Sequence, residues 1–130
     1  ITRFNQVRAL FAGSLVCARA TATAITALNP SEVTFVITGE WVDRDGDEDI
    51  ACADYLAALL NGMNPDPVRY EQRVRDSDFG RRFLAEDNPN LPASDLELCA
   101  VADRFDFTMQ ASRWHDHMVL RRVLPGGANR

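Results

Sequence analysis

The sequence has no lysine, so its fourteen basic side chains are all arginines, against nineteen acidic side chains. The formal net charge of −5 argues against a protein that binds nucleic acid through the phosphate backbone. No apolar run is long enough to cross a bilayer, so we expect neither a nucleic-acid partner nor a membrane partner. Arginine offers a planar, permanently charged group for phosphate, sulfonate or carboxylate, which leaves a small anionic ligand open.

Cysteine is also scarce, and the three cysteines have no CxxC spacing. Cys17, Cys52 and Cys99 each lie in an apolar stretch, which predicts free core thiols in a reducing, cytoplasmic compartment. The first residues lack the charged, apolar and small-residue order of a signal peptide. The sequence likewise has no serine-hydrolase elbow, no P-loop and no dinucleotide-binding glycine fingerprint.

The 130 residues, of which 46% are hydrophobic, predict a single folded domain. Helices are expected at 14–28 with Ser14 as cap, at 50–63, at 94–103 with Ser94 as cap, and over 68–84 with a break near 77–80. Strands are expected at 33–38, buried on both faces, and in a terminal hairpin of 105–111 and 118–123. Strands that alternate with helices in the first half predict an α/β fold with a parallel sheet.

Gly13 and Ser14 stand directly before the first expected helix, and Arg19 follows one turn later. A helix start offers free backbone N–H groups to an anion, so this pattern predicts a phosphate site. The alternative is that Ser14 only caps the helix and Arg19 is solvated.

Six carboxylates fall within ten residues before the second expected helix: Glu40, Asp43, Asp45, Asp47, Glu48 and Asp49. Such a run either points into water or is partly neutralised by a hard divalent cation. It is not an EF-hand, because Glu48 stands where that loop needs glycine and Asp54 where it needs glutamate. Asp45 and Glu48 have the spacing of a capping box, so the alternative is a solvated, acidic helix start.

The two histidines, His115 and His117, lie two residues apart near the expected hairpin turn. Two ligands of this kind do not make a metal site. With Trp114 and Asp116, they are therefore interpreted as the tip of the hairpin.

Several segments resemble, in order, the 2-phosphosulfolactate phosphatase (ComB-like) family. They are Asn5-Gln6-Val7-Arg8-Ala9-Leu10, residues 13–20, the apolar run 33–39, Glu48-Asp49-Ile50-Ala51-Cys52-Ala53, residues 78–84 and residues 103–123. The similarity covers most of the chain. Because family members are longer, it implies that residues 1–130 are the carboxyl-terminal portion of a longer phosphatase domain.

The resemblance implies a three-layer α/β/α fold with a mixed, partly parallel sheet. It also implies a magnesium-dependent phosphatase of coenzyme M biosynthesis, which removes phosphate from a small anionic phosphorylated acid. The residues carried over are, for the substrate, Asn5, Arg8, Ser14 and Arg19; for catalysis, Glu48 and Asp49; and for Mg²⁺, Asp45, Asp47, Glu48 and Asp49. Two interpretations compete with this one. The first is a non-catalytic cation-binding module or truncated relative, and the second is a homo-oligomer that covers an open sheet edge.

Overall fold

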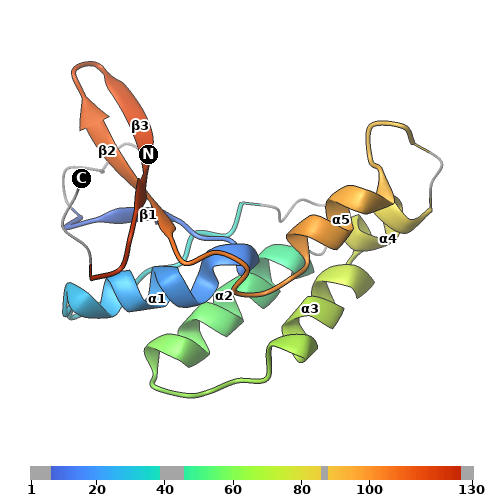
Figure 1. Cartoon of the computed structure of the whole chain (residues 1–130), viewed down its shortest axis with the longest axis horizontal. Helices are drawn as coiled ribbons and strands as arrows, with labels where there is room; N and C mark the ends of the chain where they lie inside the picture. The colour runs from blue at the N-terminus through green and yellow to red at the C-terminus, as the bar shows by residue number, and fades with distance from the viewer. Residues whose placement is uncertain (1–6, 39–45, 86–87, 127–130) are drawn as a thin grey trace.

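The computed structural model describes residues 7–38, 46–85 and 88–126 (Figure 1). Within these ranges it contains helices and one small sheet, which makes the fold a mixture of α and β structure. In chain order the elements are β1 (Leu10–Ala12), the 3-10 turn η2 (Leu15–Cys17), α1 (Ala18–Ala27), α2 (Asp47–Leu60), α3 (Pro67–Asp76), α4 (Asp78–Leu84), α5 (Ala93–Cys99), β2 (Thr108–Trp114) and β3 (His117–Val123).

The sheet has the strand order β1-β2-β3, and both strand pairs are antiparallel. The prediction of a partly parallel sheet is therefore wrong for the described residues. The first strand pairs with the terminal hairpin, Leu10 opposite Ala111, rather than with a strand that follows α1. The hairpin rises away from the helices (Figure 1), so the described residues do not form the three-layer α/β/α sandwich either.

The run 33–38, expected as a strand buried on both faces, forms no strand. Its side chains are largely exposed, and Val36 has 72% of its surface in water. A β-branched run becomes a strand only when a neighbouring strand takes up its backbone hydrogen bonds. The described part of the chain places no such neighbour beside it.

The boundaries of helices α3 and α4 agree with local capping signals in the sequence. The side chain of Asp66 accepts a hydrogen bond from the backbone of Val68, with Pro67 as the first residue of α3. Ser77 ends α3, and its hydroxyl accepts from the backbone N–H of Gly80 in α4, which confirms the predicted break near 77–80. The hairpin is confirmed as well, with its turn between Trp114 and His117.

The predicted cap and end of α5 differ from the structure. Helix α5 begins after Pro92 and ends at Cys99, so the expected Ser94 cap and the extension to residue 103 are wrong. Helix α2 begins after Gly46, which adopts a left-handed conformation, and the proposed Asp45 cap lies outside the described residues. Three acidic residues in the first turn of α2 complement the positive end of its dipole.

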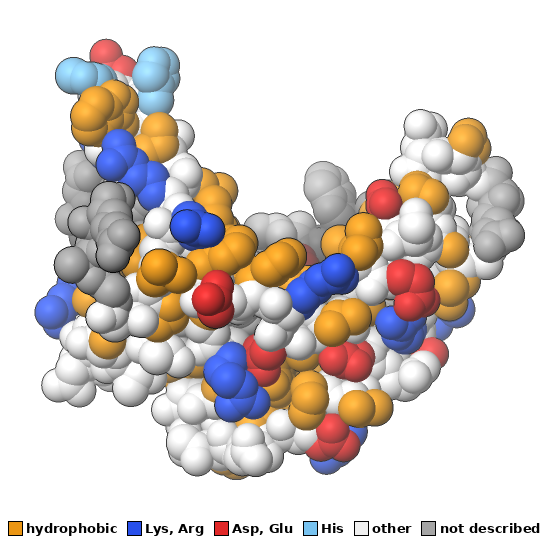
Figure 2. Space-filling model, viewed as in Figure 1, with side chains coloured by type: hydrophobic (Ala, Val, Ile, Leu, Met, Phe, Trp, Pro, Cys, Tyr) orange, Lys and Arg blue, Asp and Glu red, His pale blue; other side chains and the backbone are white. Residues whose placement is uncertain are grey.

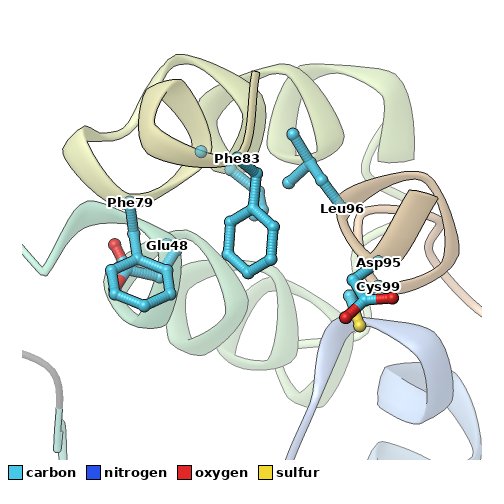
Figure 3. A pocket seen from close by; sticks show the side chains of 8 residues that line it. Glu48, Phe79, Phe83, Asp95, Leu96 and Cys99 are labelled. Atoms are coloured by element: carbon cyan, nitrogen blue, oxygen red, sulfur yellow. The ribbon is translucent and has the colours of Figure 1, made fainter. Parts of the chain in front are cut away.

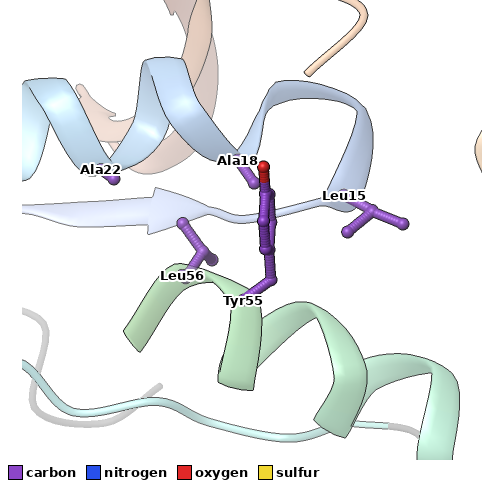
Figure 4. Close-up of a cluster of buried hydrophobic side chains, with 5 residues drawn as sticks. All are labelled: Leu15, Ala18, Ala22, Tyr55 and Leu56. Carbon is purple, nitrogen blue, oxygen red and sulfur yellow. The ribbon is translucent and has the colours of Figure 1, made fainter. Parts of the chain in front are cut away.

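The core lies where α1 packs on α2 (Figure 4). Ala18 and Ala22 in α1 are small, so the two helices approach closely around Leu56 and the fully buried Tyr55. A buried pair of hydroxyls, Thr21 in α1 and Thr108 in β2 at 2.7 Å, ties the core to the sheet. No helix in the described ranges is both long and apolar enough to cross a membrane.

The three cysteines are free thiols, as predicted, although only Cys17 is buried. Cys99 is exposed at the end of α5, which corrects its assignment to the core. Cys52 is half-buried on α2, and burial raises the pKa of its thiol to about 12. A thiol with so high a pKa is protonated near neutral pH and is a poor nucleophile.

The close approach of α4 to the end of α3 gives a stability prediction. A Cβ atom at Gly80 would overlap the backbone carbonyl groups of Val74 and Arg75, so Gly80→Ala should lower the free energy of unfolding by about 1–3 kcal/mol. Urea denaturation measures it. Gly13→Ala is the matched control, since its Cβ would meet only the flexible Leu56 side chain at 3.2 Å. Equal losses in both variants would contradict the packing described.

Candidate functional site

The most connected polar cluster joins Asp103, Arg19 and Tyr55. The carboxylate of Asp103 accepts hydrogen bonds from the backbone N–H of Arg19 at 2.7 Å and from its Nε at 3.0 Å. The hydroxyl of Tyr55 donates to the same carboxylate at 2.6 Å. Arg19 Nη2 also donates to the Tyr55 oxygen at 3.2 Å, which closes the cluster. Three donor groups therefore converge on one negatively charged group.

Each residue of this cluster is positioned by a different part of the fold. Arg19 lies in the first turn of α1, where backbone N–H groups have no partner within the helix. Tyr55 extends from the middle of α2 through the core, and its hydroxyl ends beside the first turn of α1 (Figure 4). Asp103 follows α5 in a left-handed turn with φ 55°, which an aspartate tolerates better than most residues.

The loop that carries Asp103 is held against the start of α1 by its backbone. The N–H of Asp103 donates to the carbonyl of Leu15 at 3.1 Å, and the N–H of Phe105 donates to the carbonyl of Val16 at 2.9 Å. Both acceptors belong to the 3-10 turn that leads into α1. The carboxylate is therefore fixed at the helix start by main-chain contacts on both sides of it.

The electrostatics of the cluster appear in the ionisation of Tyr55. Burial raises the pKa of the phenol, and the hydrogen bond and negative charge of Asp103 raise it further, to about 12. The nearby positive charge of Arg19 acts in the opposite direction but does not cancel these effects. Burial lowers the pKa of Arg19 itself, and its contacts with Asp103 and Tyr55 more than offset that, so its pKa is raised. At neutral pH the cluster holds a charged pair and a neutral phenol.

The predicted anion site is only partly assembled by the described residues. Arg19 lies at the start of α1 as expected, but its partner is the chain's own Asp103. The hydroxyl of Ser14 makes no cap and lies 3.1 Å from the sulfur of Cys17. Arg8 donates to the carbonyl of Leu28 at the opposite end of α1, about 14 Å along the helix axis from Arg19. Asn5 lies outside the described residues.

The acidic residues predicted for catalysis and metal binding point in different directions. Asp47 accepts from the guanidinium of Arg73, which also binds Asp54 at 2.7 Å, and these hydrogen bonds raise the pKa of Arg73. Asp49 accepts from the hydroxyl of Thr38 at 3.1 Å. Glu48 lines an apolar groove under α4 and α5. Asp45 lies outside the described residues.

Magnesium binding needs several oxygen ligands that converge on one point. In the ranges that the structure describes, no three His, Cys, Asp or Glu side chains are grouped so that they could hold a metal ion. Asp47 is already neutralised by Arg73, and Glu48 faces apolar side chains. The described residues therefore do not fit a Mg²⁺ site by themselves. His115 lies in the hairpin turn and His117 is the first residue of β3, in keeping with the tip predicted for them.

Comparison with known proteins adds no relative. No family model, no curated protein and no solved structure matches the chain. The similarity to the phosphatase family therefore stays a prediction, and functional inference depends on the geometry of the site.

Two residues of the cluster are missing from the sequence-based set. Tyr55 occupies an ordinary apolar position of α2, and Asp103 stands 84 residues after Arg19. The positive φ at Asp103 and the helix end before it are the features that turn its carboxylate toward α1. No local sequence pattern marks either residue as a partner of Arg19.

The cluster predicts how Tyr55 titrates. In a Tyr70→Phe background Tyr55 is the one remaining tyrosine, and Asp103→Asn should lower its pKa from about 12, because a charge and a charge-assisted acceptor are lost. Ultraviolet absorption against pH measures this, with circular dichroism as the control for folding.

The raised pKa of Tyr55 also makes the free energy of unfolding depend on pH in the alkaline range. The pKa of a tyrosine in the unfolded chain is about 10, so the stabilisation due to the raised pKa is complete below about pH 10 and is lost as the pH rises to about 12. An unchanged Tyr55 titration in Asp103→Asn would contradict the contact.

Proposed function

We propose that this chain provides the anion-binding part of a phosphatase that acts on a small phosphorylated acid, as in the 2-phosphosulfolactate phosphatase family that it resembles. The observation that carries the proposal is the convergence of the Arg19 backbone N–H, the Arg19 guanidinium and the Tyr55 hydroxyl on one carboxylate. These are the donor types that bind phosphate oxygens at helix starts. The Asp103 carboxylate is the anion bound there in the free protein.

A ligand can reach this cluster because Arg19 is half-exposed, with 49% of its side chain in water. Arg19 Nε donates to Asp103 and Nη2 donates to Tyr55, and within the described residues Nη1 donates no hydrogen bond. An ion pair this exposed contributes about 1 kcal/mol at most. A phosphate group with more charge and more acceptor oxygens therefore competes well for the guanidinium.

In the reaction that we propose, Arg19 and the N-terminal end of α1 stabilise the charge on the phosphoryl oxygens. A guanidinium that is already placed stabilises a transition state without reorganisation, and the helix dipole adds to it. Ser14 directly precedes the 3-10 turn that leads into α1, and its hydroxyl lies beside the sulfur of Cys17. Its proposed role is a further hydrogen bond to the substrate.

The roles of Glu48 and Asp49 as groups that act on the attacking water come from the family resemblance alone. They lie at the start of α2, and Asp49 is about 9 Å along the helix axis from Tyr55. The two halves of the proposed site therefore do not touch each other among the described residues. Because these residues do not fit Mg²⁺, we derive no step through the metal, and the magnesium requirement stays a prediction.

The alternative of a non-catalytic cation-binding module has less support. Its cation would bind in the loop 43–49. Of the described carboxylates there, Asp47 is bound to Arg73 and Asp49 to Thr38, and Glu48 faces apolar side chains. The resemblance extends the phosphatase proposal to coenzyme M biosynthesis in the cytoplasm, with a sulfonated phosphate ester as substrate. These points stay predictions.

Arg19→Gln tests the proposed anion site. Phosphate release by the purified protein, screened over phosphorylated hydroxy acids, should fall about a hundredfold in kcat/KM when this guanidinium is removed. Arg69→Gln is the matched control, because Arg69 is an exposed arginine on α3 outside the cluster. Equal activity in the wild type and Arg19→Gln would contradict the assignment, as would the absence of phosphate release from every acid in the screen.

The magnesium requirement has its own test. EDTA should abolish phosphate release and Mg²⁺ should restore it, and Asp49→Asn should raise the Mg²⁺ concentration needed for half-maximal activity. Asp54→Asn is the control on the same helix, since it also removes one carboxylate. Full activity in EDTA would show that no divalent cation takes part, and equal Mg²⁺ dependence in Asp49→Asn and the wild type would remove Asp49 from the metal site.

A further inference from the structure

A groove with an apolar floor lies between the start of α2 and helices α3, α4 and α5 (Figure 3). Its volume is about 230 Å³, and its apolar lining comes from Val74, Phe79, Phe83 and Leu96. Phe79 and Phe83 are one turn apart on α4, with ring centroids 5.4 Å apart. Phe83 therefore lies in the middle of the groove, between Phe79 and Asp95 (Figure 3).

Two carboxylates border this apolar surface. Glu48 lies beside Phe79, and Asp95 lies on the other side of Phe83 (Figure 3). In the part of the chain that the structure describes, neither side chain takes part in a hydrogen bond or an ion pair. Asp47, which precedes Glu48 in α2, is by contrast paired with Arg73. An occupant of this groove should combine an apolar or aromatic side chain with a positive charge.

The tip of the β2–β3 hairpin has this combination. Trp114 has 55% of its surface exposed, and the guanidinium of Arg121 lies 5.0 Å from the centre of its ring. Arg121 pairs with Gln110, which lies four residues before Trp114 on β2. Because side chains alternate along a strand, Trp114 and Arg121 are on the same face of the hairpin. Arg121 makes no ion pair within the described ranges. The hairpin extends from the body of the molecule (Figures 1 and 2).

We propose that the hairpin tip of one copy docks into the groove of a second copy, with Trp114 against Phe83 and Arg121 beside Asp95. The hairpin and helices α4 and α5 lie at opposite ends of the molecule (Figure 1), so one chain cannot make this contact with itself. Two copies related by a two-fold axis make it twice, which closes the assembly as a dimer. The interaction is independent of the proposed phosphatase activity.

The expected dimer is weak and sensitive to salt. Each contact buries one exposed tryptophan and a few neighbouring side chains, which is less than a stable interface needs. The charge pairs sit at the rim, so ionic strength screens them. Asp95 is exposed at the border of the groove, whereas Glu48 is half-buried.

Sedimentation velocity over a concentration series, from micromolar to near-millimolar protein, tests the proposal. The wild type should change from monomer to dimer as the concentration rises, and added salt should weaken the association. Trp114→Ala should weaken dimerisation about tenfold or more, since a central tryptophan dominates contacts of this kind. Circular dichroism checks that the variants remain folded.

A charge exchange identifies the two surfaces. Arg121→Glu and Asp95→Arg should each weaken the dimer, and the double variant should restore it because the charges attract again. Arg69→Glu, on α3, changes the net charge by the same amount as Arg121→Glu and should leave association unchanged. A wild type that stays monomeric at every concentration would overturn the proposal. So would a dimer that survives Trp114→Ala, a double variant that fails to recover, or a trimer or larger assembly.

Discussion

The hydroxyl of Tyr55 must have an acceptor, because a polar group at the edge of a packed core is costly without one. Asp103 supplies it and in doing so joins three parts of the chain that are far apart in sequence: the start of α1, the middle of α2 and the loop before β2. The loop is then close enough to α1 for Thr108 to reach Thr21 at the first residue of β2. The geometry of the candidate site depends on this carboxylate, and the backbone contacts of the same loop help to hold the sheet beside α1.

The same contact is weak enough to be exchanged. Arg19 is half-exposed and solvent screens its ion pair, so the contact orients the guanidinium without consuming much binding energy. The loop backbone is held separately by Leu15 and Val16, so release of the carboxylate need not unfold the loop. In the proposed site the donors are preorganised, and an internal anion occupies them until a phosphate ligand binds.

Features with local signals could be predicted from the sequence. The α1 region, the break at Ser77 and the terminal hairpin follow from capping residues, helical periodicity and turn spacing, and the structure confirms them. The run 33–38 could not be placed, because a strand needs a neighbour that local sequence does not specify. The parallel sheet failed for the same reason, since β1 pairs with a strand almost the whole chain away.

The candidate site shows the same division. The position of Arg19 at a helix start could be predicted from the local pattern, whereas its partner Asp103 is 84 residues distant and depends on a left-handed turn after α5. The acidic run was evident as composition, but its dispersal among Arg73, Thr38 and the groove depends on packing. A run of acidic residues in the sequence therefore suggests a cation site, and tertiary contacts decide whether the carboxylates are free to bind a cation.

The central claim is that the start of α1 exchanges Asp103 for the phosphate of a small acid. Nuclear magnetic resonance of the labelled protein tests this most directly, by following the backbone amide of Arg19 as phospholactate is added. We expect a saturable shift of the Arg19 amide, accompanied by a shift of the Asp103 amide, and no saturation with lactate at the same concentrations. An Arg19 amide that does not respond to phospholactate while other residues do would contradict it.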